Sequence, residues 1–295
     1  MTNRSEENPC KIPMACIYDF DGTLAEGDMQ EYDLVPKLGV APAEFWRMSE
    51  EIKLSHNVDG ILAYMYLIIK MAREKNIPIT RKDFAAYSRN IRFFPGVDSW
   101  FSRISAYAAD QGVEVSHFII SSGIKEMIDG TSIAGNFKAI FASCYMYDDN
   151  GNPIWPARAV NYTNKTQYIF RLNKGVLDET DDASVNNYQP RSNRPMPFKN
   201  MIYFGDGATD IPCMRLIKNF GGHAVMVFDK NKKGSREMAL DYLQKDRISL
   251  AAPNDYSAGG KLEEGTRLII DKVASRSKFD QAIDGIMREN GQELS

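Results

Sequence analysis

Short apolar runs that end in acidic or small polar residues recur along this chain. They cover residues 14–18, 113–120 and 201–204, and each is followed by Asp, Ser or Gly. The first run is apolar on both faces, which is typical of a central parallel strand with helices on both sides. Amphipathic, helix-like spacing occurs in segments such as 97–111 and 262–287. We therefore predict an α/β fold with a doubly wound, Rossmann-like parallel sheet as its core.

The segment from residue 25 to residue 92 is predicted to be almost wholly helical. Pro42 marks a helix start, and an apolar-rich helical run covers residues 58–75. A helical block of this length far exceeds the dozen or so residues that an ordinary crossover needs. We therefore expect residues 25–92 to form an inserted all-helical cap domain over the strand ends. Residues 12–24 and 93–295 would then form the sheet core.

Two further segments are predicted from their turn-forming residues. Residues 141–155 contain Asn150 and Gly151 between two β-prone runs, which predicts a hairpin. Residues 178–199 combine acidic residues, Asn, Ser and prolines. This composition predicts a long surface loop.

Two carboxylates follow the first apolar run directly. Asp19 and Asp21 would project from the same side of the strand, because side chains alternate, and Gly22 permits a sharp turn after them. The carboxyl end of a strand is where open α/β sheets bind their ligands. Two close carboxylates raise one another's pKa, and a cation would relieve this repulsion. Mg²⁺ suits such oxygen ligands, so we predict a magnesium site here; the alternative is an acidic turn without a ligand.

A second candidate site residue lies at the end of the run over 113–120. Ser121, Ser122 and Gly123 follow it, and a helix is predicted over 124–130. Free backbone N–H groups and the helix dipole favour an anion at a helix N-terminus, so this turn suits a phosphate group. Ser121, which is nearer the strand, is the preferred contact. The alternative is a serine that only caps the helix.

Together with two later segments, these residues resemble the haloacid dehalogenase-like hydrolases, within them the phosphoserine-phosphatase-like branch with a helical C1-type cap. Four motifs occur in the order of that family. They are Asp-Phe-Asp-Gly-Thr-Leu at 19–24, the serine turn at 121–123, Lys165 in the first turn of a predicted helix, and Gly-Asp-Gly-Ala-Thr-Asp at 205–210. Lys174 and Lys199 are alternatives to Lys165.

The resemblance implies a role for each matching residue. Asp19 would be the nucleophile that forms an aspartyl-phosphate, and Asp21 the general acid and base. Mg²⁺ would be held by Asp19, Asp206 and the main-chain carbonyl of Asp21. The phosphate group would be held by Ser121, Ser122, Gly123 and Lys165, while Asp210, with Gly207 before it, would orient Lys165 or a metal-bound water.

The expected activity is magnesium-dependent hydrolysis of a small phosphorylated metabolite. Dehalogenation needs no acid for the leaving group, so Asp21 argues against it. A phosphotransferase or mutase, a non-catalytic ligand-binding scaffold and a phosphonate hydrolase remain alternatives, the last with Lys53 or Lys70 as nucleophile. The acidic residue that phosphoserine phosphatases place after the first motif has several competing counterparts, Glu26, Asp28 and Glu31, so phosphoserine itself is not selected as the substrate.

The composition of the chain limits the kinds of partner and site that we expect. The chain has 295 residues and a net charge of −3, which predicts no general affinity for nucleic acid or for acidic membranes. Its four cysteines, Cys10, Cys16, Cys144 and Cys213, contain no Cys-x-x-Cys pair, so neither a zinc site nor a disulfide framework is expected. With no signal-like apolar segment near residue 1, we expect a cytoplasmic protein. Nothing in the sequence selects an oligomeric state.

Overall fold

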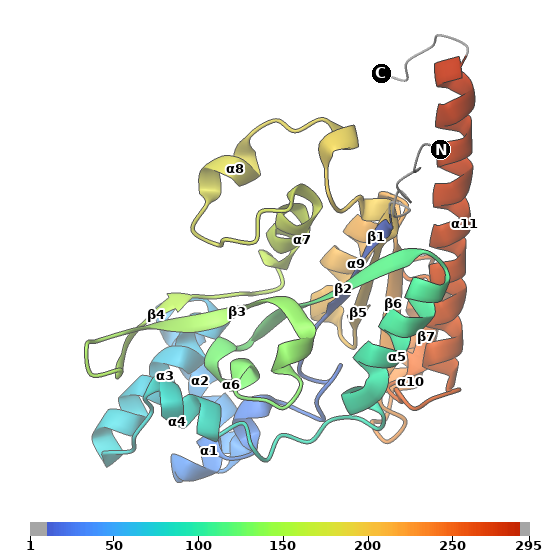
Figure 1. The fold of residues 1–295 in the computed structure, drawn as a ribbon. Coiled ribbons are helices and arrows are strands. Elements are labelled where there is room, and N and C mark those ends of the chain that lie inside the picture. Colours follow the sequence, from blue (N-terminus) through green and yellow to red (C-terminus); the bar gives the residue numbers. More distant parts are fainter. Residues whose placement is uncertain (1–10, 290–295) are drawn as a thin grey trace, which may run out of the picture.

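The computed structural model describes residues 11–289, and residues 1–10, with Cys10, and 290–295 lie outside this range. Within it, seven strands form one sheet in the order β4-β3-β2-β1-β5-β6-β7 (Figure 1). The strands are β1 Ile12–Tyr18, β2 Val113–Ile124, β3 Phe137–Tyr147, β4 Pro153–Arg158, β5 Met201–Gly205, β6 His223–Phe228 and β7 Leu250–Pro253. All neighbouring pairs are parallel except β3 and β4, which form the predicted hairpin.

Helices cover both faces of this sheet, as the apolar pattern predicted. The side chains of β1 alternate between two apolar clusters, with Cys16 and Tyr18 in one and Ala15 and Ile17 in the other. The first cluster lies under α5 Val97–Asp110 and α11 Lys261–Glu289. The second lies under α7 Lys165–Lys174, α9 Ile211–Asn219 and α10 Ser235–Gln244. The doubly wound, Rossmann-like fold is therefore confirmed.

The segment between β1 and α5 is helical and lies beyond the carboxyl end of β1 (Figure 1). It comprises the 3-10 turn η1 Met29–Glu31 and the helices α1 Leu34–Lys37, α2 Pro42–His56, α3 Gly60–Lys75 and α4 Arg81–Ala86. Its buried side chains, such as Phe45 and Leu67, belong to the same apolar cluster as those of the first sheet face. Tyr145 of β3 also donates a hydrogen bond to the Met65 carbonyl at 3.0 Å. The helical block is therefore packed directly onto the sheet.

The predicted surface loop over 178–199 contains short helices. They are α8 Asp182–Asn186 and the 3-10 turns η3 Arg191–Asn193 and η4 Phe198–Asn200. The Asp181 side chain accepts the Ser184 N–H at 2.9 Å, an N-cap that the composition did not reveal. Arg171 of α7 pairs with Asp182 at 2.9 Å. The segment thus packs along α7, the helix that begins at Lys165.

The end of β2 also differs from the prediction. The strand continues to Ile124 instead of ending at Ile120, and the helix after it, α6 Lys125–Asp129, is a single turn. The pairing register with β3 jumps from Ser121 to Ile124, so the two residues between them form a bulge. A bulge re-aims the side chains at a strand end, as is common next to active sites. The remaining 3-10 turns are η2 Ala134–Asn136 and η5 Ala208–Asp210.

The histidine of β2 is packed in the interior. His117 is buried, with Nδ1 at 3.1 Å from the Tyr18 hydroxyl and Nε2 at 3.0 Å from the Ser105 hydroxyl. Burial lowers its pKa to about 4, so this ring is neutral at pH 7. None of the helices within residues 11–289 is both long enough and apolar enough to cross a membrane.

Candidate active site

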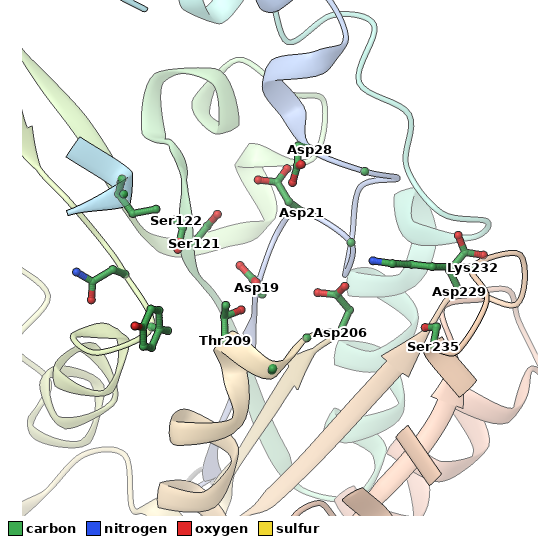
Figure 2. Close-up of a pocket in the computed structure, with 18 of the residues that line it drawn as sticks. Asp19, Asp21, Asp28, Ser121, Ser122, Asp206, Thr209, Asp229, Lys232 and Ser235 are labelled. Carbon is green, nitrogen blue, oxygen red and sulfur yellow. The ribbon is translucent and has the colours of Figure 1, made fainter. Parts of the chain in front are cut away.

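Two neighbouring strands bring the predicted carboxylates to one edge of the sheet. Residues 15–18 of β1 pair with residues 201–204 of β5, and the Asp19 N–H continues this ladder by donating to the Phe204 carbonyl at 2.9 Å. Figure 2 shows the Asp19 and Asp206 side chains turned toward the same space. In residues 11–289, oxygen atoms of Asp19, Asp206 and Asp210 lie within 4.8 Å of one another. Among these residues, no other group of three or more His, Cys, Asp or Glu side chains is arranged closely enough to hold a metal ion.

Lys165 lies inside this carboxylate group. Its side chain is 1% exposed, and its ammonium is 3.0 Å from Asp19 Oδ2 and 2.9 Å from Asp210 Oδ1. The buried Asp210 also accepts the Tyr203 hydroxyl at 2.8 Å. Asp210 therefore fixes the position of the lysine relative to Asp19.

The alternative lysines lie elsewhere. Lys174 donates to the carbonyls of Val185 and Asn187, and Lys199 pairs with Asp280. Lys70, one candidate for a phosphonate-cleaving nucleophile, is exposed and does not line the cavity described below, whereas Lys53 does. Of the three lysines considered for the third motif, the structure places Lys165 at the carboxylates.

The electrostatics of the site follow from crowding buried acids around one buried cation. Burial raises the pKa of Asp19, and the charges of Asp210 and Asp206 raise it further while Lys165 opposes the shift. Burial, with Asp210, also raises the pKa of Asp206 to about 7. Burial lowers the pKa of Lys165, but the Asp19 and Asp210 carboxylates outweigh this and hold it above its ordinary value. The site has more acids than its own lysine can neutralise, which favours a bound cation.

Asp21 is arranged differently from Asp19. Its Oδ1 accepts the Met29 N–H at 2.9 Å, and its carboxylate lies beside that of Asp28 (Figure 2). Burial raises its pKa, and the Asp28 charge adds to the effect. The predicted metal ligands were Asp19, Asp206 and the main-chain carbonyl of Asp21. The three carboxylates that lie within 4.8 Å of one another are those of Asp19, Asp206 and Asp210, so the Asp21 carboxylate is not part of this group.

The bulge at the end of β2 forms one wall of the site. Ser121 is buried and its hydroxyl oxygen accepts the Gly123 N–H at 3.0 Å, which leaves the hydroxyl proton for another acceptor. Ser121 and Ser122 line the same cavity as Asp19. The dipole of the predicted helix contributes little here, because α6 is a single turn that begins at Lys125. On this wall, an anion could therefore be contacted by the Ser121 hydroxyl and by the bulge at residues 122–123.

Gly22 and Gly207 belong to the motifs, but only one of the two positions requires a glycine. Gly22 has φ of +72°, and a Cβ there would lie 2.4 Å from Asp206 Oδ2, so a side chain would displace this carboxylate. At Gly207, a Cβ would meet only Thr209 among the described residues, and its nearest atom, Oγ1, would lie at an ordinary 3.6 Å. Its N–H lies 3.4 Å from Asp210 Oδ2. The first glycine is therefore required by packing at the site, and the second is not.

Six of the nine predicted site residues line a cavity of about 730 Å³, and they are Asp19, Asp21, Ser121, Ser122, Asp206 and Gly207. Gly123, Lys165 and Asp210 do not line it. Besides the predicted residues, it is lined by side chains that the sequence analysis did not single out, among them Asn161, Thr209, Asp229, Lys232 and Ser235. Asp229 and Lys232 follow strand β6, so the strand-end argument that found Asp19 could have found them. None of residues 178–199 lines this cavity.

Comparison with known proteins gives a family and a fold. A family model described as haloacid dehalogenase-like hydrolase matches residues 16–215. A protein of Borreliella burgdorferi, described as uncharacterized, is 27% identical over 277 residues, which cover 84% of this chain and 93% of that protein.

Solved structures give a matching arrangement of elements. A HAD family hydrolase from Salmonella enterica serovar Typhi has a TM-score of 0.52 at 18% identity, covering 77% of this chain and 66% of that chain. A phosphoserine phosphatase solved as an analogue of the phospho-aspartyl intermediate has a TM-score of 0.51 at 13% identity, covering 86% of this chain and 97% of that chain. This chain thus spans slightly less than two thirds of the Salmonella chain. At these identities the likeness establishes the fold.

Proposed function

We propose, from the premise that this chain belongs to the haloacid dehalogenase-like hydrolase family, that it is a magnesium-dependent phosphatase acting on a small phosphomonoester. The observation that carries the proposal is the placement of Asp19. Its carboxylate lies 3.0 Å from the Lys165 ammonium and within one group with Asp206, at the floor of a cavity. The proposed nucleophile, a cation and a candidate metal ligand thus lie together, and Asp19 and Asp206 line the cavity that a phosphate group could enter.

The residues present fit a magnesium ion. Hard oxygen donors converge at the strand ends. Burial, followed by the charge of Asp210, raises the pKa values of Asp19 and Asp206, so a bound cation would favour their charged forms. Asp19, Asp206 and the main-chain carbonyl of Asp21 would hold the ion. When bound, it would neutralise the charge that develops on the phosphoryl oxygens.

Asp19 would act as the nucleophile, and Asp21 would act as the general acid and base. In the first step, an Asp19 oxygen forms a bond to phosphorus as the bond from phosphorus to the alcohol oxygen breaks, and Asp21 gives its proton to that oxygen. In the second step, Asp21 takes a proton from a water that attacks phosphorus, which releases inorganic phosphate and restores the Asp19 carboxylate. The raised pKa of Asp21, caused first by burial and then by Asp28, suits an acid that must hold a proton near neutral pH.

The remaining predicted residues would hold the phosphate group. Lys165 would neutralise an oxygen beside Asp19, the Ser121 hydroxyl and the Ser122–Gly123 bulge would donate to others, and Asp210 would position Lys165. Gly207 would serve through its main-chain N–H, which lies 3.4 Å from Asp210. We further propose that residues 25–92 act as the cap domain of this core, because Lys53, Asp59 and Ile61 of that segment line the cavity.

The test is release of phosphate from p-nitrophenyl phosphate with Mg²⁺ and with EDTA, for the wild type and for Asp19→Asn. We expect turnover only with Mg²⁺, and a loss of at least about a thousandfold in Asp19→Asn. Circular dichroism of the variant serves as the folding control. Absence of turnover on a broad panel of phosphomonoesters would contradict the proposal and favour a ligand-binding scaffold.

A further inference from the structure

A second pocket, of about 320 Å³, lies on the cap side of Asp21. It shares Asp21, Ser122 and Lys53 with the larger cavity, so the two are continuous at the proposed acid. An ester whose phosphate lies at Asp19 would have its leaving oxygen near Asp21. The alcohol beyond that oxygen would then extend into this second pocket, which is the place where substrates can be distinguished.

Gln30 gives this pocket an open acceptor. The residue is 3% exposed and lines the pocket, and its Oε1 has no hydrogen-bond partner in the part of the chain that the structure describes. A buried acceptor without a donor is costly, and most buried side-chain oxygens have a partner. A ligand with an N–H or O–H donor would satisfy it.

The charges around the pocket favour a cation. Asp28 and Glu50 line it, together with Asp21, which holds a proton when the ester binds, and the one basic side chain among its lining residues is Lys53. The Lys53 ammonium already lies 2.9 and 3.0 Å from the two Glu50 oxygens. A carboxylate on the substrate would have to compete with Glu50 for this lysine, whereas an ammonium group would meet acids directly.

Aromatic side chains complete the wall. Trp46 and Tyr64 line the pocket with ring centroids 5.7 Å apart in an edge-to-face arrangement. The Tyr64 hydroxyl is held by the Ser122 carbonyl at 2.8 Å, and the Trp46 indole N–H by Glu31 at 2.6 Å. Both donors are therefore used, so these rings offer a substrate apolar surface and π faces, which suit methylene groups and cations.

We propose that this pocket receives the alcohol part of the substrate and selects an alcohol that bears a protonated amine and no carboxylate, with Gln30 as a specificity-determining residue. The inference rests on the proposed phosphatase function. The substrate class is thus an aminoalkyl phosphomonoester, in which the ammonium donates to Gln30 Oε1 and the carbon chain lies against Trp46 and Tyr64.

The test compares ω-aminoalkyl phosphates of increasing chain length with the n-alkyl phosphates of equal size, using the magnesium-loaded protein. We expect kcat/KM to favour the amine by about tenfold or more at one chain length, since a hydrogen bond to a charged group typically contributes this much. O-phosphoserine, which adds a carboxylate, is expected to be slower than 2-aminoethyl phosphate. Because each result is a ratio for one preparation, partial misfolding does not mimic it.

Variants assign the preference to Gln30. Gln30→Leu is expected to lower the ratio of amine to alkyl kcat/KM about tenfold, and Gln30→Glu, which keeps an acceptor, to retain it. Gln244→Leu makes the same chemical change at an exposed position of α10 and should leave the ratio as in the wild type. In the Asp19→Asn background, calorimetry should show a matching loss of affinity for the preferred amine ester in Gln30→Leu.

The results that would contradict this inference differ from those that would contradict the proposed function. If alkyl phosphates or p-nitrophenyl phosphate are hydrolysed but the amines gain nothing, or O-phosphoserine is preferred, the inference is wrong and the phosphatase function stands. An amine preference that Gln30→Leu leaves intact overturns the role of Gln30; if that variant does not fold, the wild-type ratios decide. If no ester is hydrolysed, the proposed function fails and the inference with it.

Discussion

The strand-end site and the cap-side pocket hold their polar groups in opposite ways. At the strand ends, Lys165 and Asp210 are buried and paired, the lysine with two carboxylates and Asp210 also with Tyr203. In the cap-side pocket, Gln30 Oε1 is buried without a partner among residues 11–289, and the Lys53–Glu50 pair is solvent-exposed. Lys165 and its two carboxylates are thus held together by the fold itself, while Gln30 has an acceptor that a ligand could complete.

This difference follows from what each region must do. Phosphoryl transfer is catalysed mainly by preorganised charge, so its residues must not rearrange during the reaction. Recognition gains when a substrate satisfies an unmet donor or acceptor, because an analogue that lacks the group leaves the site unpaired. If the proposed function holds, the strand ends would set the chemistry, and the helical segment above them would set the substrate.

Removing the buried cation should give the largest effect. Lys165→Met leaves Asp19 and Asp210 without a counter-ion, so we expect the free energy of unfolding to fall by about 3–5 kcal/mol. Phosphatase activity should fall about a hundredfold. Lys199→Met removes an ion pair at a partly exposed position and should cost less than about 1 kcal/mol. Urea denaturation of both variants measures this, and equal losses would contradict the preorganised site.

Gly22→Ala should come next. The new Cβ would clash with Asp206 at 2.4 Å and would also be strained at φ of +72°, so we expect a loss of about 2–4 kcal/mol and at least a tenfold loss of activity. Gly112→Ala introduces similar backbone strain, at φ of +78°, but its Cβ has no neighbour within 4 Å in the part of the chain that the structure describes. It should cost about 1 kcal/mol and spare activity. Matching activity losses in the two variants would show that the clash with Asp206 has no effect.

The pH dependence of the metal-free protein should show the crowding of acids. The pKa of Asp206 is raised to about 7, against an ordinary value near 4. Between these values the folded protein binds more protons than the unfolded chain, so its stability falls as the pH rises. In EDTA, we expect the wild type to lose about 1–2 kcal/mol between pH 5 and pH 7. The loss of stability over this pH range should be smaller in Asp206→Asn. Thermal denaturation of both proteins at pH 5 and pH 7 measures it, and equal losses in the two proteins would contradict this prediction.

The smallest effect is expected in the cap-side pocket. Glu50→Gln breaks an exposed pair with Lys53, so stability should change by less than about 0.5 kcal/mol. The released ammonium should accept a substrate carboxylate, and turnover of O-phosphoserine relative to 2-aminoethyl phosphate should rise severalfold. Glu51→Gln breaks the pair with Arg47 on the same helix, outside the pocket, and is the control. The same shift in both variants would exclude a local effect of Lys53.

The strand-end residues could be predicted because their position follows from periodicity. An apolar run followed by acids places Asp19 and Asp206 at the carboxyl end of adjacent parallel strands, and the structure brings them together. The bulge after Ser121 was missed, because Gly123 was interpreted as the end of the strand. The helix α8 was missed because its cap, Asp181, lies among residues whose composition is typical of loops.

The cap-side pocket could not be predicted in this way. Gln30, Trp46 and Glu50 come from a 3-10 turn and from α2, and their meeting depends on how these elements pack on the bulge at 122–123. A helical segment has many polar residues, and no spacing rule distinguishes one that lines a pocket from one in solvent. Only the packed structure shows that Gln30 is buried with an unmet acceptor.

The central claim is that Asp19 takes the phosphoryl group. The most direct measurement is to quench the magnesium-loaded protein with acid during turnover, reduce it with borohydride and map the product by peptide mass spectrometry. An acyl phosphate at position 19 would be reduced to homoserine, so we predict homoserine at this position, dependent on both Mg²⁺ and substrate. Steady turnover with aspartate intact at position 19, or with the modification at Asp21 or Asp206 instead, would contradict the account.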